Sequence, residues 1–291
     1  RHGASLRRRR RRRRKILRSI IFSCSIIAVA VFVAVGSSMI RSGDGRTNRY
    51  DVEAGNNTYD NAVIENSKIS EKNKIQNNQS MLDDIMNSTQ YPKQLKDLAL
   101  KNEEALEFVY DYPAEHVKEH TIDLTEEASM DSVPLFVQWD KRWGYEKYSG
   151  NFFAASGCGP TTLSMVVVYL THDREASPIA VAKYSKEAGY SVDGSGSSWT
   201  LISEGCMHYG VKAKAVALDE SRMKAELDEG HPIVVNVGPG DFTDTGHFMV
   251  ITGYDDEGFS INDPNSIEKS GKRWLFRNIS SQIRAVWSMY V

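Results

Sequence analysis

Ser156-Gly157-Cys158-Gly159-Pro160-Thr161-Thr162 stands directly before an apolar run from Leu163 to Leu170. The run predicts a buried helix, and Pro160 suits its first turn because the N–H that proline lacks would be unpaired there. A thiol at a helix N-terminus feels the positive end of the helix dipole, which lowers its pKa and favours the reactive thiolate. The flanking glycines let a substrate backbone approach the sulfur closely. The stretch therefore predicts that Cys158 is a nucleophile.

The region around this helix predicts a domain over residues 131–291, with helices first and strands later. Ser177-Pro178 is an N-cap followed by proline, typical of a helix start, and a further helix ends near Gly210. A polar helix covers 219–229. Alternating or apolar runs predict strands at 211–218, 232–237, 247–254, 258–262 and 284–291. This order predicts an α+β fold with N-terminal helices packed on a mainly antiparallel sheet.

A cysteine nucleophile needs a base and a group that orients the base. Of the seven histidines, His247 differs because it opens the apolar strand Phe248-Met249-Val250-Ile251 and is held rigidly at its mouth. Asp263 ends the next strand, and antiparallel neighbours would bring it alongside His247. A carboxylate there would fix the imidazole tautomer and stabilise its cation. Asn262 is the alternative orienter, and Asn-Asp-Pro is also common turn chemistry.

Gln138 is the candidate for stabilising an oxyanion. Its side-chain N–H₂ and the backbone N–H of Cys158 would together form an oxyanion hole. It lies between Val137 and Trp139, so a surface glutamine beside structural tryptophans is the competing interpretation.

These motifs resemble a known family. Gln138-Trp139-Asp140, the Cys158 turn, Gly246-His247-Phe248 and Asn262-Asp263-Pro264 look like papain-like cysteine peptidases related to the bacteriocin-processing, double-glycine leader peptidases. They are most similar to the stand-alone secreted or anchored branch of Gram-positive bacteria.

The resemblance implies a papain-like fold, with Cys158 as nucleophile, His247 as general base and Asp263 as orienter. Gln138 takes the oxyanion position only if the 20-residue gap to Cys158 is an insertion. Leader peptidases fused to transporters keep that glutamine closer, and this chain has Phe152 near that place.

The N-terminal part predicts a membrane anchor. Residues 1–18 hold eleven of the 36 basic residues and no acidic one, and residues 20–40 are 21 uncharged, mostly apolar residues. That length crosses a bilayer as a helix, and the positive-inside rule keeps the tail, 1–19, in the cytoplasm and sends the rest outside. A cleaved signal peptide is the alternative. The rest of the chain is strongly acidic, which argues against nucleic acid as a partner.

Two segments connect the anchor to the domain. Residues 41–80 are polar and lack sustained apolar periodicity, which predicts a disordered linker. Residues 81–130 predict a helical lead-in, with short helices near 92–101 and 102–110. The segment from Tyr91-Pro92 to Tyr112-Pro113 also resembles the lead-in of the anchored branch.

Three functions remain open on this sequence. The first is an anchored extracellular cysteine peptidase with a peptide or protein substrate. The second is an acyltransferase or amidase on the same triad. The third is a catalytically silent surface module in which Cys158 is simply buried or is bridged to Cys206, since an external location permits disulfides. No zinc-type spacing and no phosphate-binding loop occur, so we expect no cofactor. The sequence leaves the oligomeric state open.

Overall fold

The computed structural model describes the backbone of residues 56–291 and the side chains from residue 68 onward. The predicted basic tail, 1–19, the predicted anchor, 20–40, and the start of the predicted linker lie outside the described residues. Within the described part, no helix is both long and apolar enough to cross a membrane. Ser67–Val291 form one compact unit.

Of the linker expected to be disordered over 41–80, the described residues, 56–80, are instead helical and belong to α2 (Asn56–Asn87). Its middle is solvated as the composition predicted, with Ile69 and Ile75 both exposed. The helix is anchored instead at its C-terminal end, where Ile85 is fully buried among the lead-in helices. From this anchored end the helix can extend, because each further residue adds a backbone hydrogen bond once a first turn is formed. No Pro or Gly between residues 56 and 87 interrupts the extension.

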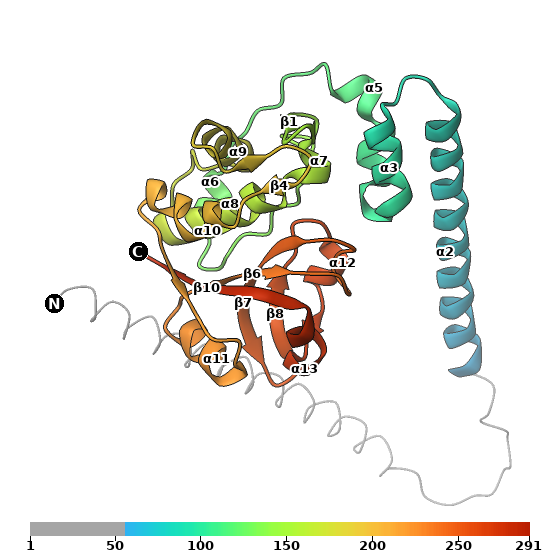
Figure 1. Ribbon diagram of the computed structural model, residues 1–291. Helices are drawn as coiled ribbons and strands as arrows, with labels where there is room; N and C mark the ends of the chain where they lie inside the picture. Colours follow the sequence, from blue (N-terminus) through green and yellow to red (C-terminus); the bar gives the residue numbers. More distant parts are fainter. Residues whose placement is uncertain (1–55) are drawn as a thin grey trace, which may run out of the picture. The chain divides into compact units, whose positions relative to one another are not determined.

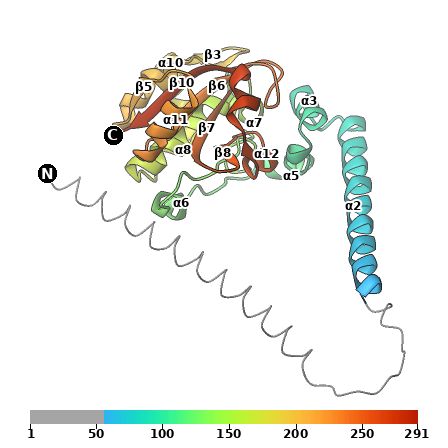
Figure 2. The same cartoon turned by 90° about the horizontal axis from the view of Figure 1, so that it is seen from below.

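The lead-in forms short helices where the sequence predicts them. They are α3 (Lys93–Lys101) and, in the second predicted segment, the 3₁₀ turn η1 (Glu103–Ala105) and α4 (Leu106–Tyr110). Two further short helices, α5 (Tyr112–Glu115) and α6 (Thr125–Ser129), were not predicted. Apolar residues of the lead-in pack with Phe152, Ala154, Trp139 and Tyr145 of the following domain. Figure 2 shows α3 on the side of that domain where α7 and α12 lie. The lead-in is therefore part of one folded body with the domain.

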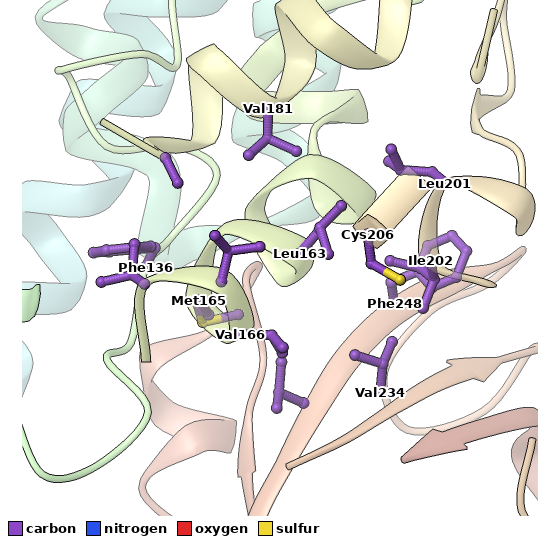
Figure 3. Close-up of a cluster of buried hydrophobic side chains, with 14 of the residues drawn as sticks. Phe136, Leu163, Met165, Val166, Val181, Leu201, Ile202, Cys206, Val234 and Phe248 are labelled. Carbon is purple, nitrogen blue, oxygen red and sulfur yellow. The ribbon is translucent and has the colours of Figure 1, made fainter. Parts of the chain in front are cut away.

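The first half of the domain is mostly helical. Its elements are β1 (Lys147–Tyr148), β2 (Asn151–Phe152), α7 (Phe153–Ser156), α8 (Cys158–Thr171), α9 (Pro178–Glu187), β3 (Ser191–Val192), β4 (Gly196–Ser197), α10 (Thr200–Ser203) and η2 (Gly205–Tyr209). Ser177 caps α9 as expected, accepting the N–H of Ala180. Helix α8 is buried at every residue from Gly159 to Val168. A helix that is apolar all round belongs in a core, and Figure 3 shows Leu163, Met165 and Val166 within it.

The second half is a six-stranded sheet in the order β5-β10-β6-β7-β8-β9, antiparallel throughout (Figure 1). The strands are β5 (Lys212–Ala215), β6 (Ile233–Val237), β7 (His247–Asp255), β8 (Gly258–Asn262), β9 (Arg273–Trp274) and β10 (Ile283–Tyr290). Among them run α11 (Glu220–Asp228), α12 (Ile267–Ser270), α13 (Phe276–Ile279) and η3 (Ser280–Gln282). The predicted α+β fold is confirmed, and the short strand β9 was not foreseen.

Alternation along β7 divides the core between the two faces of the sheet. Phe248 and Val250 join the cluster around α8, whereas Met249 and Ile251 join a second cluster with Met223 of α11. Successive side chains of a strand point to opposite faces. The register of β7 is thus fixed from both sides, and with it the position of His247 at its first residue.

Gly144→Ala tests how tightly the lead-in is docked. A Cβ at Gly144 would lie 2.7 Å from Cε2 of Phe108 and 2.9 Å from the Asp140 carbonyl oxygen. Phe108 is buried and stacks on Tyr145, so it has little room to move. We expect the free energy of unfolding to fall by about 1–3 kcal/mol, measured by urea denaturation.

Gly253→Ala is the matched control, because a Cβ there meets nothing within 4 Å. We expect a change of at most about 0.5 kcal/mol. Equal effects in the two variants would contradict close packing at Gly144.

Candidate active site

Cys158 is the first residue of α8, and its side chain is partly exposed at a cleft. The flanking glycines have a packing reason that the sequence did not reveal. A Cβ at Gly157 would lie 2.6 Å from the ring of Phe153, and a Cβ at Gly159 would lie 2.5 Å from the Ser197 hydroxyl. Both glycines let neighbouring elements close against the helix start, and so they fix the position of the sulfur.

His247 and Asp263 meet as the antiparallel pairing of β7 and β8 predicts. Nε2 of His247 lies 2.7 Å from Oδ1 of Asp263, and both side chains are buried. The bond at Nε2 leaves Nδ1 as the ring nitrogen that can face the Cys158 sulfur. The alternative orienter is engaged elsewhere, since Nδ2 of Asn262 donates to the carbonyls of Val133 and Pro134.

The surroundings of the thiol and the imidazole favour their charged forms. Burial by itself raises the pKa of the Cys158 thiol, but the hydrogen bond and positive charge of His247 outweigh it and bring the pKa below its usual value. The backbone N–H groups of Phe248 and Gly159 act in the same direction. Burial by itself lowers the pKa of His247, but the charge and hydrogen bond of Asp263, followed by those of Cys158, raise it to about 10. Both shifts favour a thiolate–imidazolium pair over the neutral thiol and imidazole.

Gln138 lines the same cleft as Cys158 and His247. Its Nε2 donates to the Ala154 carbonyl oxygen at 2.7 Å, which sets the orientation of the amide. Among the described residues only the Ala154 carbonyl accepts from this amide, which leaves its second N–H without a protein acceptor. The backbone N–H of Gln138 donates to the Pro264 carbonyl, one residue after Asp263.

The segment between Gln138 and Cys158, which are 20 positions apart, folds back so that its end returns to Gln138. A turn, the β1–β2 hairpin and α7 fill it, and α7 returns Ala154 to the glutamine. Phe152, the residue that the spacing placed near the oxyanion position, is instead buried among the lead-in side chains. The structure therefore brings Gln138, and not Phe152, to the cleft.

The cleft has a volume of about 490 Å³ and mostly polar walls. Helix α3 lines it through Gln94, Asp97, Leu98 and Lys101, which the sequence reasoning missed because helical periodicity indicates only the buried face. The segment Gly240–Gly246, which precedes His247, also lines it. Gln282 clamps this loop, accepting the N–H of Asp241 and donating to its carboxylate.

The described cysteines do not form a bridge. Cys158 and Cys206 are both free thiols. Cys206 is fully buried in the core around α8, and burial raises its pKa to about 11. The described residues contain no group of three or more His, Cys, Asp or Glu side chains suited to a metal ion.

Residues 130–291, more than half of the chain, match the Peptidase C39-like family, and the chain belongs to this family. Two solved structures are similar to it. One is the peptidase domain of Streptococcus ComA, a bi-functional ABC transporter involved in a quorum sensing pathway, with 19% identity, a TM-score of 0.39, and coverage of 54% of this chain and 96% of that chain. The other is a C39-like peptidase from Bacillus anthracis, with 16% identity, a TM-score of 0.35, and coverage of 55% and 95%. A search of curated proteins finds no match.

Alkylation with iodoacetamide tests the ion pair without any substrate. We expect Cys158 to react quickly at neutral pH while Cys206 stays unmodified until the chain is denatured, as read by peptide mass spectrometry. The rate should rise with pH in two steps. The first lies below the usual thiol pKa, and the second lies near pH 10, where His247 loses its proton and leaves a more nucleophilic free thiolate. A single step at the pKa of an ordinary thiol would contradict the pairing.

Proposed function

We propose that the chain is a cysteine peptidase in which Cys158 is the nucleophile, His247 the general acid and base, Asp263 its orienter and Gln138 an oxyanion donor. The observation that carries this proposal is the buried 2.7 Å contact between Asp263 and His247, a histidine that lines the same cleft as Cys158. A nucleophile, a base and a group that orients the base are the parts that acyl transfer by a thiol requires.

The first half of the reaction acylates the enzyme. The Cys158 thiolate attacks the peptide carbonyl carbon, and the carbonyl π electrons move to oxygen. The second N–H of Gln138 and the backbone N–H of Cys158 stabilise this oxyanion. The oxyanion then collapses, the C–N bond breaks, and His247 gives the proton on Nδ1 to the leaving amine.

The second half releases the acyl group. Neutral His247 takes a proton from a water molecule, and the resulting hydroxide attacks the thioester carbonyl. Collapse of the second oxyanion expels the Cys158 thiolate, which restores the ion pair with His247. Asp263 accepts the Nε2–H throughout, so the ring keeps Nδ1 toward the sulfur and its cation stays stabilised.

Anchoring in a cell membrane, with the catalytic domain outside, is a separate part of the proposal and rests on sequence alone. The Arg-rich residues 7–15 followed by the uncharged residues 20–40 support it. We expect the full chain to stay in the membrane fraction after a carbonate wash and a variant lacking residues 1–40 to leave it. A full chain that washes off would contradict the anchor.

A library of quenched fluorescent peptides tests the activity. We expect hydrolysis by the full chain to disappear in Cys158→Ala, and Gln138→Ala to lower kcat by about 10²–10³-fold, since one oxyanion donor is lost. Cys206→Ala is the control, because it removes a thiol that lies outside the cleft. Full activity in Cys158→Ala would refute the assignment of the nucleophile.

A further inference from the structure

The lead-in reaches the turn that carries Asp263 through Asn102. Nδ2 of Asn102 donates to the carbonyl oxygen of Asn265 at 2.9 Å and to its side-chain oxygen at 3.0 Å. Oδ1 of Asn102 accepts the N–H of Glu104 and so caps η1. One amide therefore ties the start of η1 to a residue two positions after Asp263.

Glu104 holds the next part of the same turn. Its carboxylate accepts the N–H of Ile267 at 2.7 Å and the N–H of Glu268 at 3.0 Å, and it bonds the hydroxyl of Ser266. Hydrogen bonds to an ionised acceptor are about twice as strong as neutral ones. A single carboxylate from the lead-in thus collects the donors of three consecutive residues at the start of α12.

The same turn is also hydrogen-bonded to the catalytic candidates, through Asn265 and Asp263. The backbone N–H of Asn265 donates at 2.8 Å to Oδ1 of Asp263, the same oxygen that receives His247. The Nε1–H of Trp139, next to Gln138, donates to the Asn265 carbonyl. Hydrogen bonds therefore run without interruption from Asn102 through Asn265 and Asp263 to His247.

If the hydrogen bonds that hold the turn were lost, displacement of the Asp263 side chain toward water would be favoured. Its side chain is fully buried, and its second oxygen, Oδ2, has no hydrogen-bond partner among the described residues. An unpartnered buried carboxylate oxygen carries a desolvation cost. A turn free to rotate would lower that cost by exposing the carboxylate to water, and His247 would lose its partner.

We propose that Asn102 and Glu104 are positioning residues of the active site, although they lie outside the segment that matches the peptidase family. They hold the turn 263–268 so that Oδ1 of Asp263 stays against Nε2 of His247. This inference rests on the proposed function, since it concerns the same site. The lead-in would then position a catalytic residue in addition to lining the cleft through α3.

Glu104→Gln in the full chain tests this inference. The amide keeps one oxygen for the N–H groups of Ile267 and Glu268, which share Oε2 of Glu104, but that oxygen is no longer ionised and its hydrogen bonds are weaker. The N–H₂ replaces the oxygen that accepts from the Ser266 hydroxyl, so the turn is loosened. The charged groups acting on His247 are Asp263 and Cys158. With Asp263 displaced, the second step of the iodoacetamide profile should move from near pH 10 toward 6.5 by at least about one pH unit. We expect kcat on the peptide library to fall about 10–100-fold.

Glu107→Gln is the matched control, because it removes the same charge from the exposed face of the next helix, α4. Its alkylation profile and kcat should equal those of the unchanged chain. If Glu104→Gln gives the same profile as Glu107→Gln, the positioning role is refuted.

Asn102→Asp is the second variant, and it decides the question if Glu104→Gln does not fold. It keeps the oxygen that caps η1 and replaces the two donors to Asn265 with an acceptor. The second alkylation step should again move to lower pH, and an unmoved step refutes the proposal. Alkylation needs no substrate, so a shifted profile without peptide hydrolysis would support the positioning role while refuting the peptidase function.

Discussion

The buried hydrogen bond between His247 and Asp263 is the interaction on which the rest of the site depends. Both side chains are excluded from water, and an isolated charge in such a place would be neutralised by a pKa shift. Paired at 2.7 Å, they compensate each other, and the imidazolium in turn lowers the pKa of the Cys158 thiol. The sheet supplies this geometry, since β7 and β8 pair with Val250 opposite Asn262 and leave His247 and Asp263 at the same end.

The site keeps polar atoms that a purely structural core would satisfy. Oδ2 of Asp263 and Oε1 of Gln138 are buried and lack partners among the described residues. Each unpartnered atom costs free energy. In each side chain the other polar atom is hydrogen-bonded, Oδ1 of Asp263 to His247 and Nε2 of Gln138 to the Ala154 carbonyl. Such an arrangement persists only if its surroundings permit no relaxation. Asn102 of the lead-in donates to the Asn265 carbonyl and the backbone N–H of Gln138 donates to the Pro264 carbonyl, and these hydrogen bonds provide that restraint.

The sequence allowed Cys158, His247 and Asp263 to be predicted because each stands at a local signal. The signals are a helix start, the mouth of an apolar strand and a proline turn after a strand. The α+β class followed from the order of the same elements. Asn102 and Glu104 carry no such signal, because their bonds to residues 265–268 span more than 160 positions. Helix α2 was not predicted because its local sequence is polar and resembles that of a linker. The residues that anchor it to the domain lie only at its C-terminal end.

The two described cysteines have pKa values shifted in opposite directions by their environments. Cys206 is enclosed by apolar side chains of the core, so burial raises its pKa to about 11 and leaves it a neutral thiol. Cys158 is also affected by burial, but an imidazolium and two backbone N–H groups reverse the direction of its shift. Removing the imidazolium would leave burial as the largest influence on Cys158, and its pKa would move toward that of Cys206. The pKa of the Cys158 thiol therefore depends on the charge of His247, and that charge depends on Asp263. Asp263 itself lies on a turn that is held by Asn102 and Glu104, outside the segment that matches the family.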